Sequence, residues 1–211
     1  MEVCEIYKSL QGESTFAGAV CSFVRLARCN LNCSYCDTIY AQAAGTEHTV
    51  QDIYDEVAGH GAHLVEITGG EPLMQAETPI LCKHFLDMGF RVLIETNGTF
   101  PISNLPTGCV RIVDVKTPSS NHAGSFDMNN LSQLQKIDEA KFVITDRNDF
   151  DWSVDFITTY HLERMCTLLF SPNAALLDAR RLGEWILDTR LNIRLNPQLH
   201  KLLWGTDARG V

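Results

Sequence analysis

The fold and the chemistry of this chain are organised around residues 28–38, which read Arg28-Cys29-Asn30-Leu31-Asn32-Cys33-Ser34-Tyr35-Cys36-Asp37-Thr38. Three cysteines form a Cys-x3-Cys-x2-Cys pattern here, and thiolates this close together can hold three corners of one [4Fe–4S] cube. Clusters held entirely by protein normally take four cysteine ligands. One iron would therefore keep an open position, and we expect the chain to present that iron to a small molecule.

Other uses of these cysteines have to be weighed. A zinc site usually takes four ligands, often from two separated Cys-x2-Cys pairs. Only one such pair is present, and the nearest downstream histidine, His48, lies in a polar loop. A disulfide framework is disfavoured in a chain without a signal-peptide pattern. Chance clustering of buried cysteines stays open, and the remaining cysteines lie singly: Cys4, Cys21, Cys82, Cys109 and Cys166.

Length and charge bound the class of protein. A chain of 211 residues is long enough for one domain with a substantial core, which we expect to span residues 1–211. The net charge of −9 excludes broad, non-specific nucleic-acid binding, although a small anion needs only a local Arg or Lys. No apolar run approaches the roughly 20 residues of a membrane span. We expect a cytoplasmic protein with neither a nucleic-acid nor a membrane partner.

Expected strands and helices alternate along the chain. This alternation predicts an α/β fold with a parallel sheet and right-handed crossovers. The chain is too short for a complete eight-fold barrel of roughly 250 residues, so we expect a partial (β/α)6 barrel. Strands are expected at 20–28, 63–68, 91–96, 110–115, 140–144, 165–170 and 192–195. Helices are expected from Thr49, over 78–88, from 146 to about 160 and over 175–188, followed by a polar tail.

The candidate functional residues each follow the carboxyl end of an expected strand. Parallel α/β sheets and barrels place their sites at that edge. Because independent loops agree on one edge, their convergence is stronger evidence than any single motif. The segments are the cysteine loop, Thr68-Gly69-Gly70-Glu71-Pro72, Glu95-Thr96-Asn97-Gly98, Asp114-Val115-Lys116 and Ser171-Pro172-Asn173.

Each of these loops has a functional and a purely structural interpretation. Gly69-Gly70 lets the backbone approach a ligand with unpaired N–H and C=O groups, or it makes a tight turn. Glu95 and Asn97 suit ribose hydroxyls, or they form a turn. Lys116 can hold a carboxylate or lie in a solvated loop.

Three residues outside the strand ends add to this pattern. Gln11 carries paired donor and acceptor atoms that can read the edge of a heterocycle, or it lies in an exposed N-terminal turn. Arg25, inside an apolar strand, calls for an anion such as a carboxylate, or for an internal Asp or Glu. Thr38 offers an oxygen to an ion such as Mg²⁺, or it is structural.

These motifs resemble those of the radical S-adenosylmethionine (SAM) enzymes, through Cys29-x3-Cys33-x2-Cys36 and Thr68-Gly69-Gly70-Glu71-Pro72. Within them the chain is similar to the 7-carboxy-7-deazaguanine synthase family. That resemblance runs from residue 10 to the end. It is carried by Leu10-Gln11-Gly12-Glu13, Phe23-x-Arg25, Cys36-Asp37-Thr38, Glu95-Thr96-Asn97-Gly98, Lys116-Thr117-Pro118-Ser119-Ser120 and the tail Pro197-Gln198-Leu199-His200-Lys201-Leu202-Leu203-Trp204-Gly205.

The resemblance implies a barrel of the radical SAM type and a set of ligands for each cofactor. The [4Fe–4S] cluster would be held by Cys29, Cys33 and Cys36, and Mg²⁺ by Thr38. SAM would chelate the open iron and contact Tyr35, Cys36, Asp37, Gly70, Asp114, Val115, Lys116, Ser171, Pro172, Asn173 and Ala174. The pterin substrate would contact Leu10, Gln11, Gly12, Arg25 and Thr68, with Arg25 facing its carboxylate.

The implied activity is a lyase reaction of queuosine and other 7-deazapurine biosynthesis. It is a SAM- and Mg²⁺-dependent radical ring contraction of 6-carboxy-5,6,7,8-tetrahydropterin to 7-carboxy-7-deazaguanine, with loss of ammonia. An electron donor such as a flavodoxin or ferredoxin and a homodimeric state are also implied. A glycyl-radical-enzyme activating enzyme is the alternative activity, and a non-catalytic iron–sulfur or zinc protein is a third interpretation.

Two features depart from the family pattern. Ser14 stands where the family usually has glycine, so we expect an altered turn after Glu13. Some members end in a proline whose carboxylate meets the substrate, whereas this sequence continues through residues 205–211. No terminal contact is therefore carried over to this chain.

Overall fold

Nine strands form one sheet in the computed structural model, which describes residues 1–205 and 208–210. Their order is β3-β1-β2-β4-β5-β6-β7-β8-β9, with β3 and β9 at the two edges, so the sheet is not closed. The strands are β1 (Glu2–Leu10), β2 (Val20–Leu26), β3 (Thr46–Glu47), β4 (Leu64–Gly69), β5 (Arg91–Thr96), β6 (Val110–Asp114), β7 (Glu139–Ile144), β8 (Thr167–Pro172) and β9 (Ile193–Leu195).

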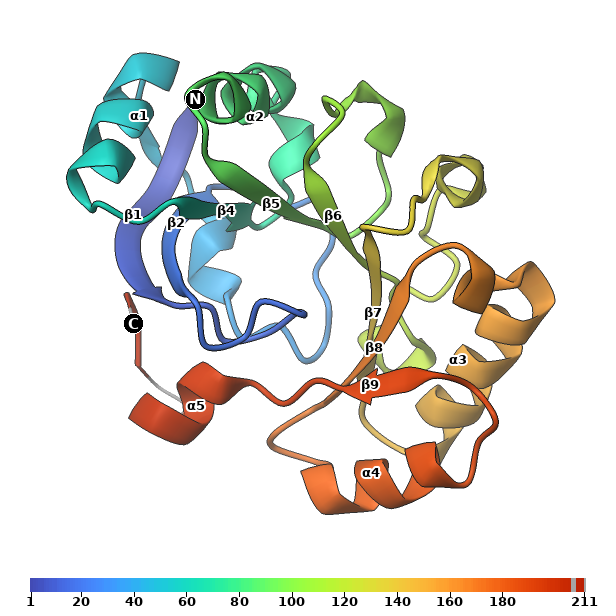
Figure 1. Ribbon diagram of the computed structural model, residues 1–211. Helices are drawn as coiled ribbons and strands as arrows, with labels where there is room; N and C mark the ends of the chain where they lie inside the picture. Colours follow the sequence, from blue (N-terminus) through green and yellow to red (C-terminus); the bar gives the residue numbers. More distant parts are fainter. Residues whose placement is uncertain (206–207, 211) are drawn as a thin grey trace.

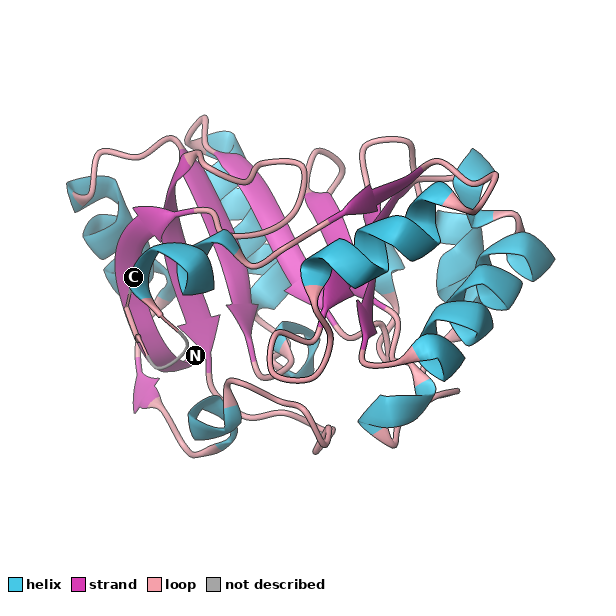
Figure 2. Cartoon of the chain, turned by 90° about the horizontal axis from the view of Figure 1, so that it is seen from below, coloured by secondary structure: helices cyan, strands magenta, loops and turns pink. Residues whose placement is uncertain are grey.

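Seven neighbouring strands are parallel: β2, β4, β5, β6, β7, β8 and β9. At one edge, β1 pairs antiparallel with β2, and β3 pairs antiparallel with β1. Four helices contact strands of this sheet from the outside, and a fifth follows β9 (Figure 1). These helices are α1 (Val50–Gly59), α2 (Thr78–Asp87), α3 (Arg147–Tyr160), α4 (Ala179–Leu187) and α5 (Leu199–Trp204). The predicted partial barrel is confirmed; Figure 2 shows the curved sheet from below.

Alternate residues of the parallel strands face opposite sides of the sheet. Val24 and Ile67 point outward into the main core beneath the helices. Phe23 and Leu93 point inward, where they fill the lower part of the barrel. Apolar side chains therefore close one end of the barrel and leave its other end for polar groups.

The structure corrects several predicted boundaries. Residues 2–10, assigned no strand from sequence, form β1 and pair with β2. The predicted strand 165–170 is wrong by two residues, because Ser171 and Pro172 pair with β7 as part of β8. The helix predicted over 175–188 starts only at Ala179, since the Asp178 side chain caps it by accepting from the Arg180 N–H. The predicted polar tail contains α5.

Other predictions are confirmed by local geometry. The helix predicted from Thr49 is confirmed, since Thr49 caps α1 through a capping box with Asp52 and the apolar residues Ile53 and Val57 are buried. The predicted strand 91–96 matches β5. Among the described residues, no helix is both long enough and apolar enough to span a membrane.

Candidate active site

A cavity of about 1080 Å³ lies at the carboxyl ends of the parallel strands. All of the predicted site residues except Val115 line it. Val115 is buried in the core, and its backbone N–H donates to the carbonyl of Lys141. The lining residues predicted from sequence are Leu10, Gln11, Gly12, Arg25, Cys29, Cys33, Tyr35, Cys36, Asp37, Thr38, Thr68, Gly70, Asp114, Lys116, Ser171, Pro172, Asn173 and Ala174.

The three cysteines of the 28–38 loop are free thiols, each partly buried at the cavity. The loop is held against the segment that follows β6. The Ser34 backbone N–H donates to the carbonyl of Ser120, and the Ser34 hydroxyl donates to the carbonyl of Ser119. Burial raises the pKa of the Cys29 and Cys33 thiols.

The double glycine packs against the start of the cysteine loop. The N–H of Gly70 donates to Leu26 O over 3.1 Å, and the N–H of Glu71 donates to Arg28 O over 2.8 Å. A Cβ atom on Gly70 would lie 2.0 Å from Arg28 O, so only glycine fits there. The prediction of an unpaired N–H is therefore wrong at Gly70, because the turn uses this group and the N–H of Glu71 to position the cysteine loop.

Glu71 connects the loop after β5 to the double-glycine turn and the cysteine loop. Its fully buried carboxylate accepts from the Leu73 N–H at 2.9 Å, the Thr96 hydroxyl at 2.7 Å and the Asn97 N–H at 2.7 Å. Burial raises the pKa of Glu71, although these hydrogen bonds oppose the shift. The acid of the Gly69-Gly70-Glu71-Pro72 motif therefore joins the loops after β4 and β5.

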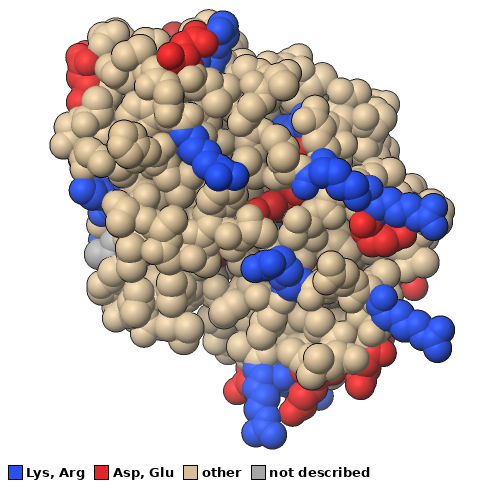
Figure 3. Space-filling model, in the orientation of Figure 1, with Lys and Arg blue, Asp and Glu red and all other residues tan. Residues whose placement is uncertain are grey.

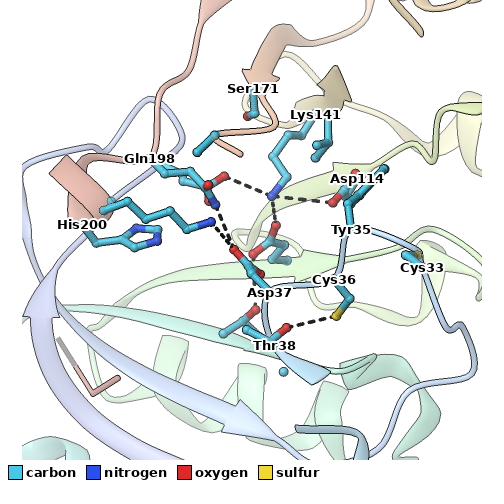
Figure 4. Close-up of a pocket in the computed structure, with 18 of the residues that line it drawn as sticks. Cys33, Tyr35, Cys36, Asp37, Thr38, Asp114, Lys141, Ser171, Gln198 and His200 are labelled. Carbon is cyan, nitrogen blue, oxygen red and sulfur yellow. Dashed lines mark hydrogen bonds and ion pairs between the residues drawn. The ribbon is translucent and has the colours of Figure 1, made fainter. Parts of the chain in front are cut away.

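Lys141, which points from β7 into the cavity, gathers carboxylates from three other elements (Figure 4). Its Nζ lies 3.1 Å from Glu13 Oε2 and 3.7 Å from Asp114 Oδ2, and it also contacts Glu95. Burial acts to lower the pKa of Lys141, but these carboxylates outweigh it and raise the pKa. Burial likewise acts to raise the pKa of Asp114, and Lys116 and Lys141 outweigh it.

Arg25 has an internal partner. Its Nε lies 2.7 Å from Glu5 Oε1, and a terminal nitrogen donates to the Tyr7 hydroxyl over 2.9 Å. Of the two partners predicted for Arg25, a bound anion or an internal acid, the structure shows the internal acid. The side chain still lines the cavity, so a substrate carboxylate would meet a guanidinium that is already fixed in place.

Helix α5 covers one side of the cavity, beside β1 (Figure 1). The Leu199 N–H donates to Gly12 O over 2.8 Å, and Gln198 donates to Glu13 Oε1 over 2.8 Å. A Cβ atom on Gly12 would lie 2.2 Å from His200 Nδ1, so a larger residue there would displace the His200 ring. The segment after β9 therefore bridges back to the opposite edge of the sheet.

Sequence reasoning missed several residues that line this cavity. Lys141 carried the same signal as Arg25, a charged residue within an apolar strand, and could have been found that way. Glu66 carried that signal in the predicted strand 63–68. The residues of α5 belong to the tail motif of the resemblance, but no site role was predicted for them, because the position of α5 depends on contacts with Gly12 and Glu13. Among the missed residues are Glu13, Glu66, Lys141, Gln198, His200 and Lys201.

The residues present fit an iron–sulfur cluster and a nucleoside cofactor. No three His, Cys, Asp or Glu side chains within 1–205 and 208–210 converge on a single metal ion. Three free thiols that line one cavity supply the type of ligand that an iron–sulfur cube takes. Asp114 Oδ1 is buried without a hydrogen-bond partner in the described part of the chain, which suits a hydroxyl donor. Figure 3 shows acidic atoms in a central hollow with basic side chains around it.

Comparisons with known proteins agree with this geometry. The radical SAM superfamily matches residues 24–111. Proteins named 7-carboxy-7-deazaguanine synthase from Koribacter versatilis and Chlorobaculum tepidum are each 40% identical to this chain over its full length, covering 100% and 97% of their own. One from Thermoplasma acidophilum is 39% identical over the whole of both chains.

The fold has a counterpart among solved structures. The crystal structure of QueE from Escherichia coli superposes with a TM-score of 0.78 over 94% of both chains. The sequence identity is 23%, so this likeness concerns the fold alone.

Proposed function

The chain belongs to the 7-carboxy-7-deazaguanine synthase family of radical SAM enzymes, and from this premise we propose that its cavity holds the cluster, SAM, Mg²⁺ and the pterin side by side. The enzyme is a lyase that contracts the ring of 6-carboxy-5,6,7,8-tetrahydropterin. The observation that carries the arrangement is one cavity of about 1080 Å³, lined from the carboxyl ends of β2, β4, β5, β6, β7 and β8 and from α5.

The cluster is assigned to Cys29, Cys33 and Cys36. When bound, the cluster and SAM supply the one-electron chemistry that starts the reaction. The protein holds the three thiols at the cavity through Ser34 and the turn at Gly70. Metal binding removes the thiol protons that burial otherwise retains.

SAM is assigned to the side of the cavity formed by β6 and β8. Asp114 offers its unpaired Oδ1 to a hydroxyl, and Lys116, 2.9 Å from Oδ2, holds that carboxylate in place. Gly70 approaches from the neighbouring turn. The other residues assigned to SAM are Tyr35, Cys36, Asp37, Val115 through its backbone, Ser171, Pro172, Asn173 and Ala174.

The pterin is assigned to the side formed by β1, β2 and β4. Arg25, held by Glu5, would face the substrate carboxylate, and Thr68 lies opposite Arg25 in the register of the sheet. Mg²⁺ is assigned to Thr38. The Thr38 hydroxyl lies 3.7 Å from Cys36 Sγ, so it borders both the cluster ligands and the pterin side of the cavity. Leu10, Gln11 and Gly12 complete the pterin side.

The remaining assignments rest on the family alone. They are a single radical SAM domain, a flavodoxin or ferredoxin as electron donor, a homodimer and a cytoplasmic location. Sedimentation of the reconstituted protein and reduction by each purified donor test the oligomer and the donor.

Anaerobic turnover separates the proposed function from its main alternative. The reconstituted enzyme is incubated with 6-carboxytetrahydropterin, SAM, reductant and Mg²⁺, and the products are identified by mass spectrometry. We expect 7-carboxy-7-deazaguanine from the wild type and none from Cys33→Ala. Formation of 5′-deoxyadenosine without a deazaguanine would instead support an activating enzyme that acts on a partner protein.

A further inference from the structure

Glu66 lies at the floor of the cavity. It comes from β4, where it pairs with Phe23 of β2. Two residues further along each strand, nearer the opening, Thr68 pairs with Arg25. Since alternate residues of a strand share a face, Glu66 lies directly below Thr68. Its side chain lines the cavity although the residue is only 4% exposed.

Gln11 fixes the orientation of this carboxylate. The Gln11 Oε1 accepts the Glu13 N–H at 2.9 Å, so the amide must turn its Nε2 toward Glu66. That Nε2 donates to Glu66 Oε2. The Gln11 backbone N–H is itself held by Ala19 O at 2.7 Å. Glu66 is therefore pinned through one oxygen, while Oε1 has no protein donor among the residues described.

Glu66 differs in this respect from the other acids that line the cavity. Asp114 is paired with Lys116, Asp37 with Lys201, and both Glu13 and Glu95 with Lys141. Within the described chain no Lys or Arg nitrogen lies within ion-pair distance of Glu66. A buried acceptor without a cation or a second donor calls for a ligand that brings N–H groups.

The surroundings of Glu66 suit a flat heterocycle. Phe23, its neighbour across the sheet, stacks on Tyr7 with ring centroids 5.0 Å apart and 12° between the planes. Both rings line the cavity, so an aromatic wall lies on β2, next to the strand that carries Glu66, and on β1 beyond it. The guanidinium of Arg25 and the hydroxyl of Thr68 lie one step higher, toward the opening.

We propose that Glu66, oriented by Gln11, is a specificity-determining residue that accepts hydrogen bonds from the 2-amino group and N3–H of the pterin. This inference rests on the proposed function, because the 2-amino-4-oxopyrimidine edge belongs to the assigned substrate. A pterin presents two adjacent N–H donors there, in a fork that favours the ionised carboxylate over the neutral acid when the ligand is bound. The substrate carboxylate would then point up toward Arg25 and Thr38.

The test compares two unreactive ligands. 6-Carboxypterin carries the 2-amino group, whereas 6-carboxylumazine has a carbonyl oxygen in its place. Binding of each to the reconstituted enzyme with SAM and Mg²⁺ is measured by anaerobic equilibrium dialysis. We expect the wild type to prefer the pterin by at least about tenfold, because the lumazine keeps N3–H but places a carbonyl oxygen against the Glu66 carboxylate where the second donor should be.

The Glu66→Gln variant presents an amide donor in the same volume. We expect it to bind the pterin at least about tenfold more weakly and to lose the preference over the lumazine, with iron content and SAM affinity unchanged. Glu56→Gln, an exposed change on α1, is the matched control and should bind as the wild type.

The outcomes separate the inference from the function on which it rests. Equal binding of pterin and lumazine by the wild type would by itself overturn the role of Glu66. An unchanged preference for the pterin in Glu66→Gln would also overturn it. Failure of the wild type to bind either ligand, with SAM still bound, would count against the pterin assignment itself. Loss of preference only in Glu66→Gln supports the proposal.

Discussion

Lys201 Nζ lies 2.6 Å from Asp37 Oδ2, so a helix near the carboxyl end of the chain holds the residue that follows the third cysteine. Gln198 reaches the same Asp37 oxygen at 3.3 Å (Figure 4). Burial acts to raise the pKa of Asp37, but Lys201 outweighs it and lowers the pKa. An ion pair therefore connects α5, which covers one side of the cavity, to the cysteine loop.

Replacing this lysine should weaken SAM binding. Lys201→Met removes a partly exposed ion pair worth about 0.5–1 kcal/mol, so the KM for SAM should rise about two- to fivefold with the iron content unchanged. Lys83→Met breaks the exposed pair with Asp87 on α2 and serves as the control. A KM equal to that of the control would show that Asp37 needs no help from α5.

Glu71 should act on stability. Glu71→Gln places an amide donor against backbone and hydroxyl donors that are buried, which costs about 1–3 kcal/mol. We therefore expect the free energy of unfolding of the reconstituted protein in urea to fall by about 2 kcal/mol. Glu56→Gln should leave it unchanged. An equally small effect from both substitutions would contradict the role of Glu71 in joining the two loops.

Ser14 occupies a left-handed backbone position, with φ of 64°, at the point where the family usually has glycine. Its Oγ accepts from the Phe16 N–H at 3.1 Å, which compensates part of the strain. At ordinary positions alanine is more stabilising than glycine, but here the order should reverse. Ser14→Gly should be about 1 kcal/mol more stable than Ser14→Ala in urea unfolding. The usual order would contradict the turn seen after Glu13.

Glu66 should make stability depend on pH. Burial, together with Glu95 and Glu13, raises the pKa of Glu66 to about 8, against about 4.3 in an unfolded chain. The unfolded chain therefore loses this proton first, and the stabilisation present below about pH 4 is lost as the pH rises toward 8. The other groups that interact with it are Lys141, Gln11, Tyr7 and Cys21.

An amide at this position cannot ionise, so the stability of Glu66→Gln should not fall in this way as the pH rises. Each pKa unit corresponds to about 1.4 kcal/mol, which makes the expected effect a few kcal/mol. The melting temperature of Glu66→Gln relative to the wild type should rise from about pH 6 to about pH 8. A difference independent of pH would show that Glu66 is already ionised in the empty cavity.

Sequence reasoning located the strand ends because their signals are local. The strand 91–96 is an apolar run bounded by a turn, and Thr49 is followed by apolar residues at helical spacing, Val50, Ile53 and Val57, so both were predicted. The cysteine loop and the double glycine were found for the same reason. Their convergence at one cavity followed from the common edge of parallel strands.

The missed parts depend on distant contacts. β1 has mostly half-buried residues and a register shift near Val3, so it shows no clean alternation. Helix α5 has no buried residue and is held through Gly12, Glu13 and Asp37, which lie far away in sequence. The Glu66–Gln11 pair likewise joins residues 55 positions apart. Such pairings carry no signal until the barrel is assembled.

The central claim is that one cavity brings the cluster, SAM and the pterin within reach of one another. The most direct measurement is the fate of deuterium placed at carbon 6 of 6-carboxytetrahydropterin during anaerobic turnover. The account predicts deuterium at the 5′ carbon of the adenosyl group, in recovered SAM or 5′-deoxyadenosine, together with 7-carboxy-7-deazaguanine. Cleavage of SAM with all the deuterium left in the pterin or released to water would contradict it.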